Sequence, residues 1–178
     1  MRNEFDIYPG QPGYNPGIGY IAKYEPENLV AGDFKNVKRD ILLLKGQGKL
    51  PRGSLLGRIN KVPDLPNGET RDQDETNALE AKIGKFVISL PDANDGSEIP
   101  VCILAENQDT GAKHHVDSNK QKILEDMPSV AYMSGEFLKE GVYLGDDDNN
   151  KHDLDSWDIQ STLHMRSIFL ERSIEPLA

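Results

Sequence analysis

Apolar residues in this chain gather in short runs, separated by segments rich in glycine, proline and acidic side chains. Runs of this kind bounded by turn residues are typical of β-strands, because a helix needs a longer stretch with a 3.6-residue period. The pattern predicts strands at 37–45, 54–59, 86–90, 99–105, 129–134, 137–144 and 167–170.

Turn residues suggest how some of these strands are connected. Gly46-Gln47-Gly48 ends the first run and predicts a turn with a hairpin-like return. The runs 129–134 and 137–144 flank Gly135-Glu136, a separation that predicts a tight hairpin.

One helix is predicted late in the chain. Asp155 or Ser156 can cap a short helix that runs to about Arg166. Ile159 and Leu163 share one face through their i,i+4 spacing, while Trp157 points elsewhere. We therefore expect an α+β fold that is mostly β, with a compact strand-rich body and about one short C-terminal helix.

Three polar or irregular segments lie outside this body. Residues 60–82 and 106–127 are polar, and we expect them to form two long surface loops. Residues 1–20 combine three prolines with four glycines, which prevents a regular helix or a central strand. The expected organisation is a flexible N-terminal arm, 1–20, and a single domain, 21–178, with polar excursions at 60–82 and 106–127.

The arm is rich in apolar and aromatic side chains, which are scarce in inert linkers. A mobile segment with such residues is suited to docking on another protein. The candidate contact residues are Phe5, Ile7, Tyr8, Tyr14, Ile18 and Tyr20.

Charge and hydropathy exclude several classes of protein. The net charge is −10 and basic residues are scattered, so no stripe is available to neutralise phosphates and we expect no nucleic-acid partner. The apolar runs at 41–44 and 101–105 are far shorter than a membrane span, and the first residues lack the apolar segment of a signal peptide. We expect the protein to be made in the cytoplasm, and we expect no association with a membrane.

No residue pattern indicates catalysis, a cofactor or a metal. Cys102 is the only cysteine, and its apolar neighbours predict a buried thiol and not a nucleophile. The aspartates at 146–148 lack the glycine and glutamate of a calcium loop, and the adjacent His114 and His115 diverge too much to share a zinc ion. We expect no catalytic residue, no cofactor and no metal ligand.

Four stretches, taken in order, resemble the head decoration protein family of lambda-like tailed bacteriophages. Residues 25–34 read Glu-Pro-Glu-Asn-Leu-Val-Ala-Gly-Asp-Phe, and 52–57 read Arg-Gly-Ser-Leu-Leu-Gly. Residues 96–105 read Gly-Ser-Glu-Ile-Pro-Val-Cys-Ile-Leu-Ala, and 134–137 read Ser-Gly-Glu-Phe. The excursions at 60–82 and 106–127 and the long arm depart from the compact family pattern.

The resemblance implies a structural virion protein without enzymatic activity. Proteins of this family form homotrimers on the outer surface of the expanded capsid, at three-fold and quasi-three-fold positions, and stabilise it against internal DNA pressure. The implied partners are the major capsid protein and further copies of the chain, and the implied location is the virion.

Two other classes of function remain open from the sequence. A carbohydrate-binding or tail-associated β module would also be acidic and strand-rich, and its aromatic residues would cluster on one face. An enzyme accessory or hydrolase domain would need adjacent carboxylates with raised pKa values in a pocket.

Overall fold

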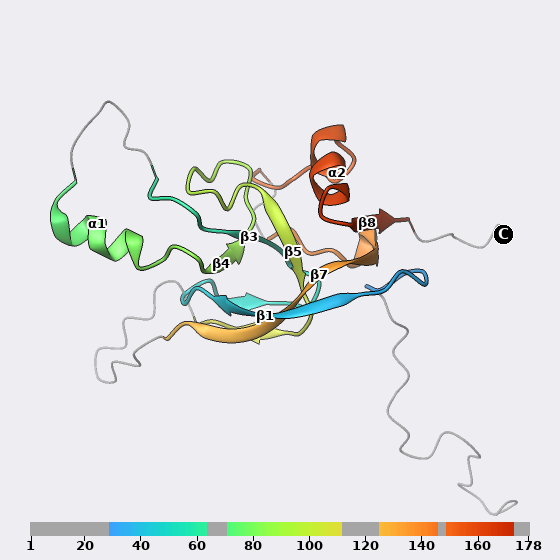
Figure 1. Ribbon diagram of the computed structural model, residues 1–178, viewed down its shortest axis with the longest axis horizontal. Coiled ribbons are helices and arrows are strands. Elements are labelled where there is room, and N and C mark those ends of the chain that lie inside the picture. Colours follow the sequence, from blue (N-terminus) through green and yellow to red (C-terminus); the bar gives the residue numbers. More distant parts are fainter. Residues whose placement is uncertain (1–28, 64–70, 112–124, 146–148, 173–178) are drawn as a thin grey trace, which may run out of the picture.

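The computed structural model describes residues 29–63, 71–111, 125–145 and 149–172 (Figure 1). Strands predominate, which confirms the predicted mostly-β α+β class. In chain order the elements are β1 (Val37–Leu43), β2 (Lys49–Leu50), β3 (Leu55–Arg58), α1 (Gln73–Glu80), β4 (Phe86–Ile88), β5 (Pro100–Leu104), β6 (Gln108–Asp109), β7 (Met127–Leu138), the 3-10 turn η2 (Lys139–Gly141), α2 (Trp157–His164) and β8 (Ile168–Glu171).

The main sheet closes on itself like a barrel. Its strands follow the order β1, β4, β3, β5, β7 and β8, and β7 pairs in addition with β1. The closing pair is antiparallel and runs from Val37 opposite Ser134 to Leu43 opposite Met127. Closure satisfies strand edges that would otherwise be free to pair with other chains. Strand β8 lies outside the closed circuit, parallel to the last four residues of β7.

Strand β7 shows that the predicted hairpin around Gly135 is wrong. The chain continues as one strand through this glycine, whose φ is 153°. Residues before it pair with β1 and β5, and residues from Gly135 onward pair with β8. A glycine within a strand can mark a bend as well as a turn, and here it marks the place where β7 changes partners.

The return predicted at Gly46-Gln47-Gly48 is also wrong, because β1 pairs with β4 and β7, whereas β2 pairs with β6 and β3 pairs with β4 and β5. The Gln47 side chain holds this turn against the main sheet. Its Nε2 donates to the carbonyl of Leu44 at 2.6 Å and to that of Phe86 at 3.2 Å. Its Oε1 accepts from the N–H of Ile88 at 2.8 Å. One side chain thus connects the turn to two backbone groups of β4, and the Phe86 carbonyl also accepts from the N–H of Leu44 at 3.0 Å.

Side chains alternate between two cores on opposite faces of the sheet, as strand geometry requires. The inner core fills the barrel and consists of Ile41, Leu43, Leu50, Leu56, Cys102, Leu104 and Ala131. The outer core lies on the other face of the sheet, against α2, and consists of Leu29, Leu55, Ile103, Ala105, Tyr132, Phe137, Leu154, Leu163 and Ile168.

Helix α2 forms as its sequence predicts. The side chain of Ser156 caps the helix by accepting from the N–H of Ile159. Leu163 is buried and Ile159 packs beside it, whereas Trp157 is 79% exposed. After the helix, Ser167 adopts a left-handed φ of 57°, and the chain turns directly into β8.

Helix α1 was not predicted, because its eight residues have no continuous apolar stripe. Asp72 caps it by accepting from the N–H of Glu75 at 2.7 Å, and none of its residues is buried. Figure 1 shows α1 projecting away from the strands.

The other predicted loop, 106–127, contains β6 and the buried Thr110 near its start, and β7 begins at Met127.

Candidate functional site

The predicted capsid-binding residues Phe5, Ile7, Tyr8, Tyr14, Ile18 and Tyr20 lie outside the described residues. The first three described residues, Leu29–Ala31, are called the arm root here. Leu29 is 1% exposed, and its carbonyl accepts from the N–H of Leu138 at 2.7 Å. Ala31 donates to the carbonyl of Glu136 at 2.9 Å. The arm root is therefore fixed to the end of β7.

The four stretches that carry the family resemblance meet in one place. They contribute five side chains to the outer core: Leu29, Leu55, Ile103, Ala105 and Phe137. Backbone hydrogen bonds join the second and third stretches, from the N–H of Gly53 to the carbonyl of Leu104 and from the N–H of Leu104 to the carbonyl of Ser54, both at 2.9 Å. Segments far apart in the sequence thus form a single structural centre.

An aromatic cluster lies on the surface near the arm root. The rings of Phe34 and Phe169 meet edge to face with centroids 5.4 Å apart, and the His164 ring lies 5.3 Å from Phe169. Phe34 is 42% exposed, and Met165, next to His164, is 82% exposed. Exposed aromatic and methionine side chains are enriched in protein interfaces.

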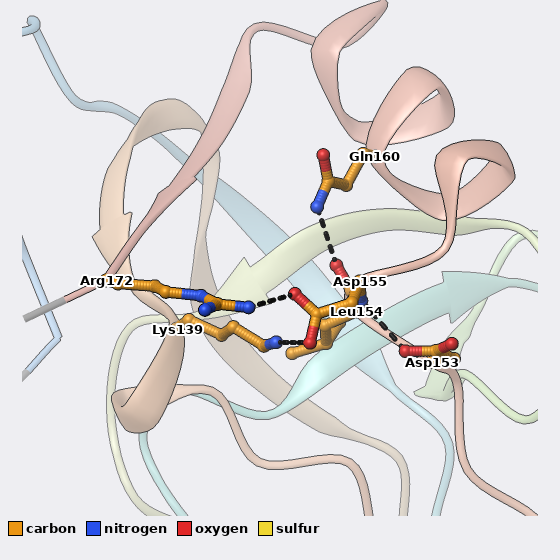
Figure 2. Close-up of polar contacts among 6 residues, drawn as sticks. All are labelled: Lys139, Asp153, Leu154, Asp155, Gln160 and Arg172. Carbon is orange, nitrogen blue, oxygen red and sulfur yellow. Dashed lines mark hydrogen bonds and ion pairs between the residues drawn. The ribbon is translucent and has the colours of Figure 1, made fainter.

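A polar clasp connects the segments around α2 and β8 (Figure 2). The carboxylate of Asp155 accepts from Lys139 Nζ and, at 2.9 Å, from Arg172 Nη2. The hydrogen bond from Lys139 lowers the pKa of Asp155 most, and the hydrogen bond from Arg172 lowers it further. Gln160 Nε2 donates to the carbonyl of Leu154 at 3.1 Å. The clasp fixes the end of β8 beside η2, although the ion pairs are exposed and individually weak.

Ser89 and His152 form a buried pair with Oγ and Nε2 2.9 Å apart. The Ser89 hydroxyl also lies 2.8 Å from the carbonyl of Ser97, which can only accept. Its single proton therefore goes to Ser97, and His152 must donate through Nε2. This is the reverse of the proton direction by which a histidine activates a serine nucleophile.

Burial lowers the pKa of His152 below its ordinary value of 6.5. The folded state thus favours the neutral imidazole, and this contribution to stability is complete above about pH 6.5 and is lost as the pH falls toward the folded pKa. We expect the melting temperature to fall more between about pH 7 and pH 5.5 in the natural protein than in His152→Gln. Calorimetry at both pH values tests this, and equal decreases would contradict it.

Several predictions about chemistry can be compared with the structure. Cys102 is fully buried, as predicted, and burial raises the pKa of its thiol to about 12. His114, His115 and Asp146–Asp148 lie outside the described residues. Elsewhere in the described chain, no three histidine, cysteine, aspartate or glutamate side chains are grouped so that they could hold a metal ion. Within the same residues, no helix has the length and apolarity that a membrane span requires.

The open end of the barrel forms a cavity of about 450 Å³, called the mouth here. Three arginines line it: Arg39 of β1, Arg58 of β3 and Arg166, which follows α2. Sequence reasoning missed this site because the three lie far apart in the chain. The available signal was strand alternation, which places Arg39 on the same face as Ile41 and Arg58 on the same face as Leu56.

No protein-family model matches this chain, and no curated protein sequence matches it. Its function is therefore inferred from its residues and their geometry.

Proposed function

We propose that this chain is a structural virion protein that binds the exterior of an expanded phage capsid and stabilises it against internal DNA pressure. In this proposal it acts as a homotrimer at three-fold and quasi-three-fold positions, with the major capsid protein as its partner. The observation that carries the proposal is the meeting of the four family-like stretches in one core, through Leu29, Leu55, Ile103 and Phe137.

The meeting of the four stretches in one core matters, because short stretches that resemble a family by chance have no reason to pack together. A shared fold, by contrast, is specified by the residues of its core and by positions with special backbone requirements. Gly57, in the second stretch, is such a position. A Cβ atom there would lie 1.9 Å from the carbonyl oxygen of Ser97, in the third stretch.

The fixed arm root supports a division of labour between body and arm. Because Leu29 is anchored in the core, tension on the arm would be transmitted to β7. In a closed trimer three arms would act together, so that their weak contacts gain affinity through avidity.

Removing residues 1–20 is expected to weaken capsid binding at least tenfold, about 1.4 kcal/mol, because the aromatic contacts of the arm are lost. The melting temperature of the body should hardly change, since the arm root and both cores remain. Binding is measured by sedimentation with expanded capsids that lack the protein, and bound positions are mapped by electron microscopy.

A control variant keeps the arm at full length and replaces Phe5, Tyr8, Tyr14 and Tyr20 with serine. It separates the aromatic contacts from the length of the arm and should bind as weakly as the truncated protein. Full binding by both variants would assign capsid attachment to the body. Single copies bound away from three-fold positions would contradict the trimer.

A second candidate, a carbohydrate-binding module, is favoured by one observation. Trp157 is 79% exposed on α2, and exposed aromatic rings can stack on sugars. Glycan-array binding that disappears in Trp157→Ala would favour this function over capsid decoration.

A further inference from the structure

We propose that the mouth of the barrel is a docking site for helix α1 of a second copy of the chain, with the acidic helix held by Arg39, Arg58 and Arg166. This contact deepens the proposed homotrimer and rests on it. It follows from two charged surfaces that have no counterpart among the residues that the structure describes.

The mouth combines positive charge with an apolar floor. Ile41, Phe86, Val101 and Met133 line the cavity and pack on or belong to the inner core. Asp40 is the single carboxylate among the lining residues, so three guanidinium groups face one acid. Such a cavity fits a ligand with carboxylates and a small apolar side chain.

The three guanidinium groups are available for binding. Arg39, Arg58 and Arg166 are exposed, and their side chains make no hydrogen bond or ion pair with any other described residue. Arginine is well suited to such a role because its planar group can bind a carboxylate through two parallel hydrogen bonds.

Helix α1 has the complementary composition. At 100° per residue, Asp74, Glu75, Ala78 and Leu79 share one face, which combines two carboxylates with two apolar side chains. The side chains of Asp74 and Glu75 are exposed and make no ion pair within the described chain, and no residue of α1 is buried. The helix therefore gains little stabilisation by packing against its own body. Contact with another copy would explain why its acidic and apolar face is exposed.

The geometry favours contact between copies over contact within one copy. The excursion that carries α1 leaves and re-enters the body at Asn60 and Gly84, both of which line the mouth. Figure 1 shows that the helix then extends away from the barrel and does not fold back over it. The projecting helix of one copy and the mouth of another can form a head-to-tail contact, and three such contacts can close a ring.

Nucleic acid does not fit this site. The whole chain has a net charge of −10, which repels a phosphate backbone, and the apolar floor has no counterpart on phosphate groups. A partner segment with its own carboxylates and apolar side chains satisfies both parts of the mouth.

Disulfide trapping between two singly substituted proteins tests the contact. Glu75→Cys places a thiol on α1 and Arg58→Cys places one in the mouth, while Cys102 is buried. When the two proteins are mixed and oxidised, we expect a mixed dimer at least tenfold more abundant than with the control pair Glu75→Cys and Asp109→Cys. Asp109 is exposed and lies in the separate two-stranded sheet.

The mixture is oxidised both in concentrated solution and on capsids, which separates this contact from the proposed function. Capsid binding without the specific mixed dimer would overturn the α1 contact and leave capsid decoration standing. A specific mixed dimer in solution without capsid binding would support the contact and overturn decoration. Absence of the mixed dimer in both conditions would overturn the contact.

Charge reversal gives an independent measurement. Arg39→Glu/Arg58→Glu and Asp74→Lys/Glu75→Lys should each weaken self-association at least tenfold, and mixing the two variants should restore it. Lys35→Glu/Lys49→Glu, a matched change of exposed charges outside the mouth, should have little effect. If the mouth variant loses capsid binding but keeps self-association, the occupant is an acidic surface of the coat protein, and the contact with α1 is wrong.

Discussion

Replacing Phe137 with alanine is expected to lower the free energy of unfolding by about 3–5 kcal/mol. The side chain is fully buried, and its ring lies 5.2 Å from that of Tyr132 in the outer core. The substitution removes the ring and leaves a cavity among segments from four parts of the chain. The closed sheet on one side and α2 on the other restrict the movement of neighbouring side chains into this cavity.

Chemical denaturation of Phe137→Ala and of Trp157→Ala measures this effect against a matched control. Both substitutions remove an aromatic ring, but Trp157 is 79% exposed and its loss should change stability by no more than about 0.5 kcal/mol. Similar losses for the two variants would mean that the outer core is not the centre of stability. Because the family-like stretches meet at Phe137, that result would also remove the main support for the proposed function.

Replacing Gly53 with alanine is expected to cost about 3 kcal/mol, because two penalties coincide at this residue. Its φ is 94°, which disfavours any residue with a Cβ atom. The added Cβ would also lie 2.2 Å from the carbonyl oxygen of Gly141. Gly53 cannot move freely, since its N–H donates to Leu104 and its carbonyl accepts from Tyr143.

Gly48→Ala separates the two penalties. Gly48 has a similar φ of 83°, but nothing lies within 4 Å of its added Cβ. Only the backbone penalty of about 1–2 kcal/mol applies there. Equal losses of stability in Gly48→Ala and Gly53→Ala, measured by denaturation, would show that the close approach to Gly141 is unimportant.

The proposed function and the inferred contact assign separate tasks to three parts of the chain. The arm would grip the shell, the fixed arm root would transmit the load, and the excursion that carries α1 would connect copies. The arm and the excursion can be altered without touching either core, whereas Leu29 of the arm root belongs to the outer core. Capsid binding and self-association can therefore be measured in arm and excursion variants that remain folded.

The sequence by itself determined where most strands lie and how the late helix begins. A run of apolar residues between turn residues is a local property, and it identified β1, β3, β4, β5 and β8 within a few positions. The Ser156 cap is equally local, because it joins residues three positions apart. Burial of Cys102 followed from its apolar neighbours for the same reason. The arm residues were selected by composition and remain a prediction.

Tertiary structure decided which strands pair and which side chains meet. The pairing of β1 with β7 joins residues about ninety positions apart, and nothing near Gly135 in the sequence reveals that the strand continues and changes partner there. The mouth depends on the same closure, because Arg39, Arg58 and Arg166 converge only when distant strands are brought into register. Strand formation is favoured by local residue preferences, whereas strand order and register are set by contacts between distant residues, and these contacts create the sites.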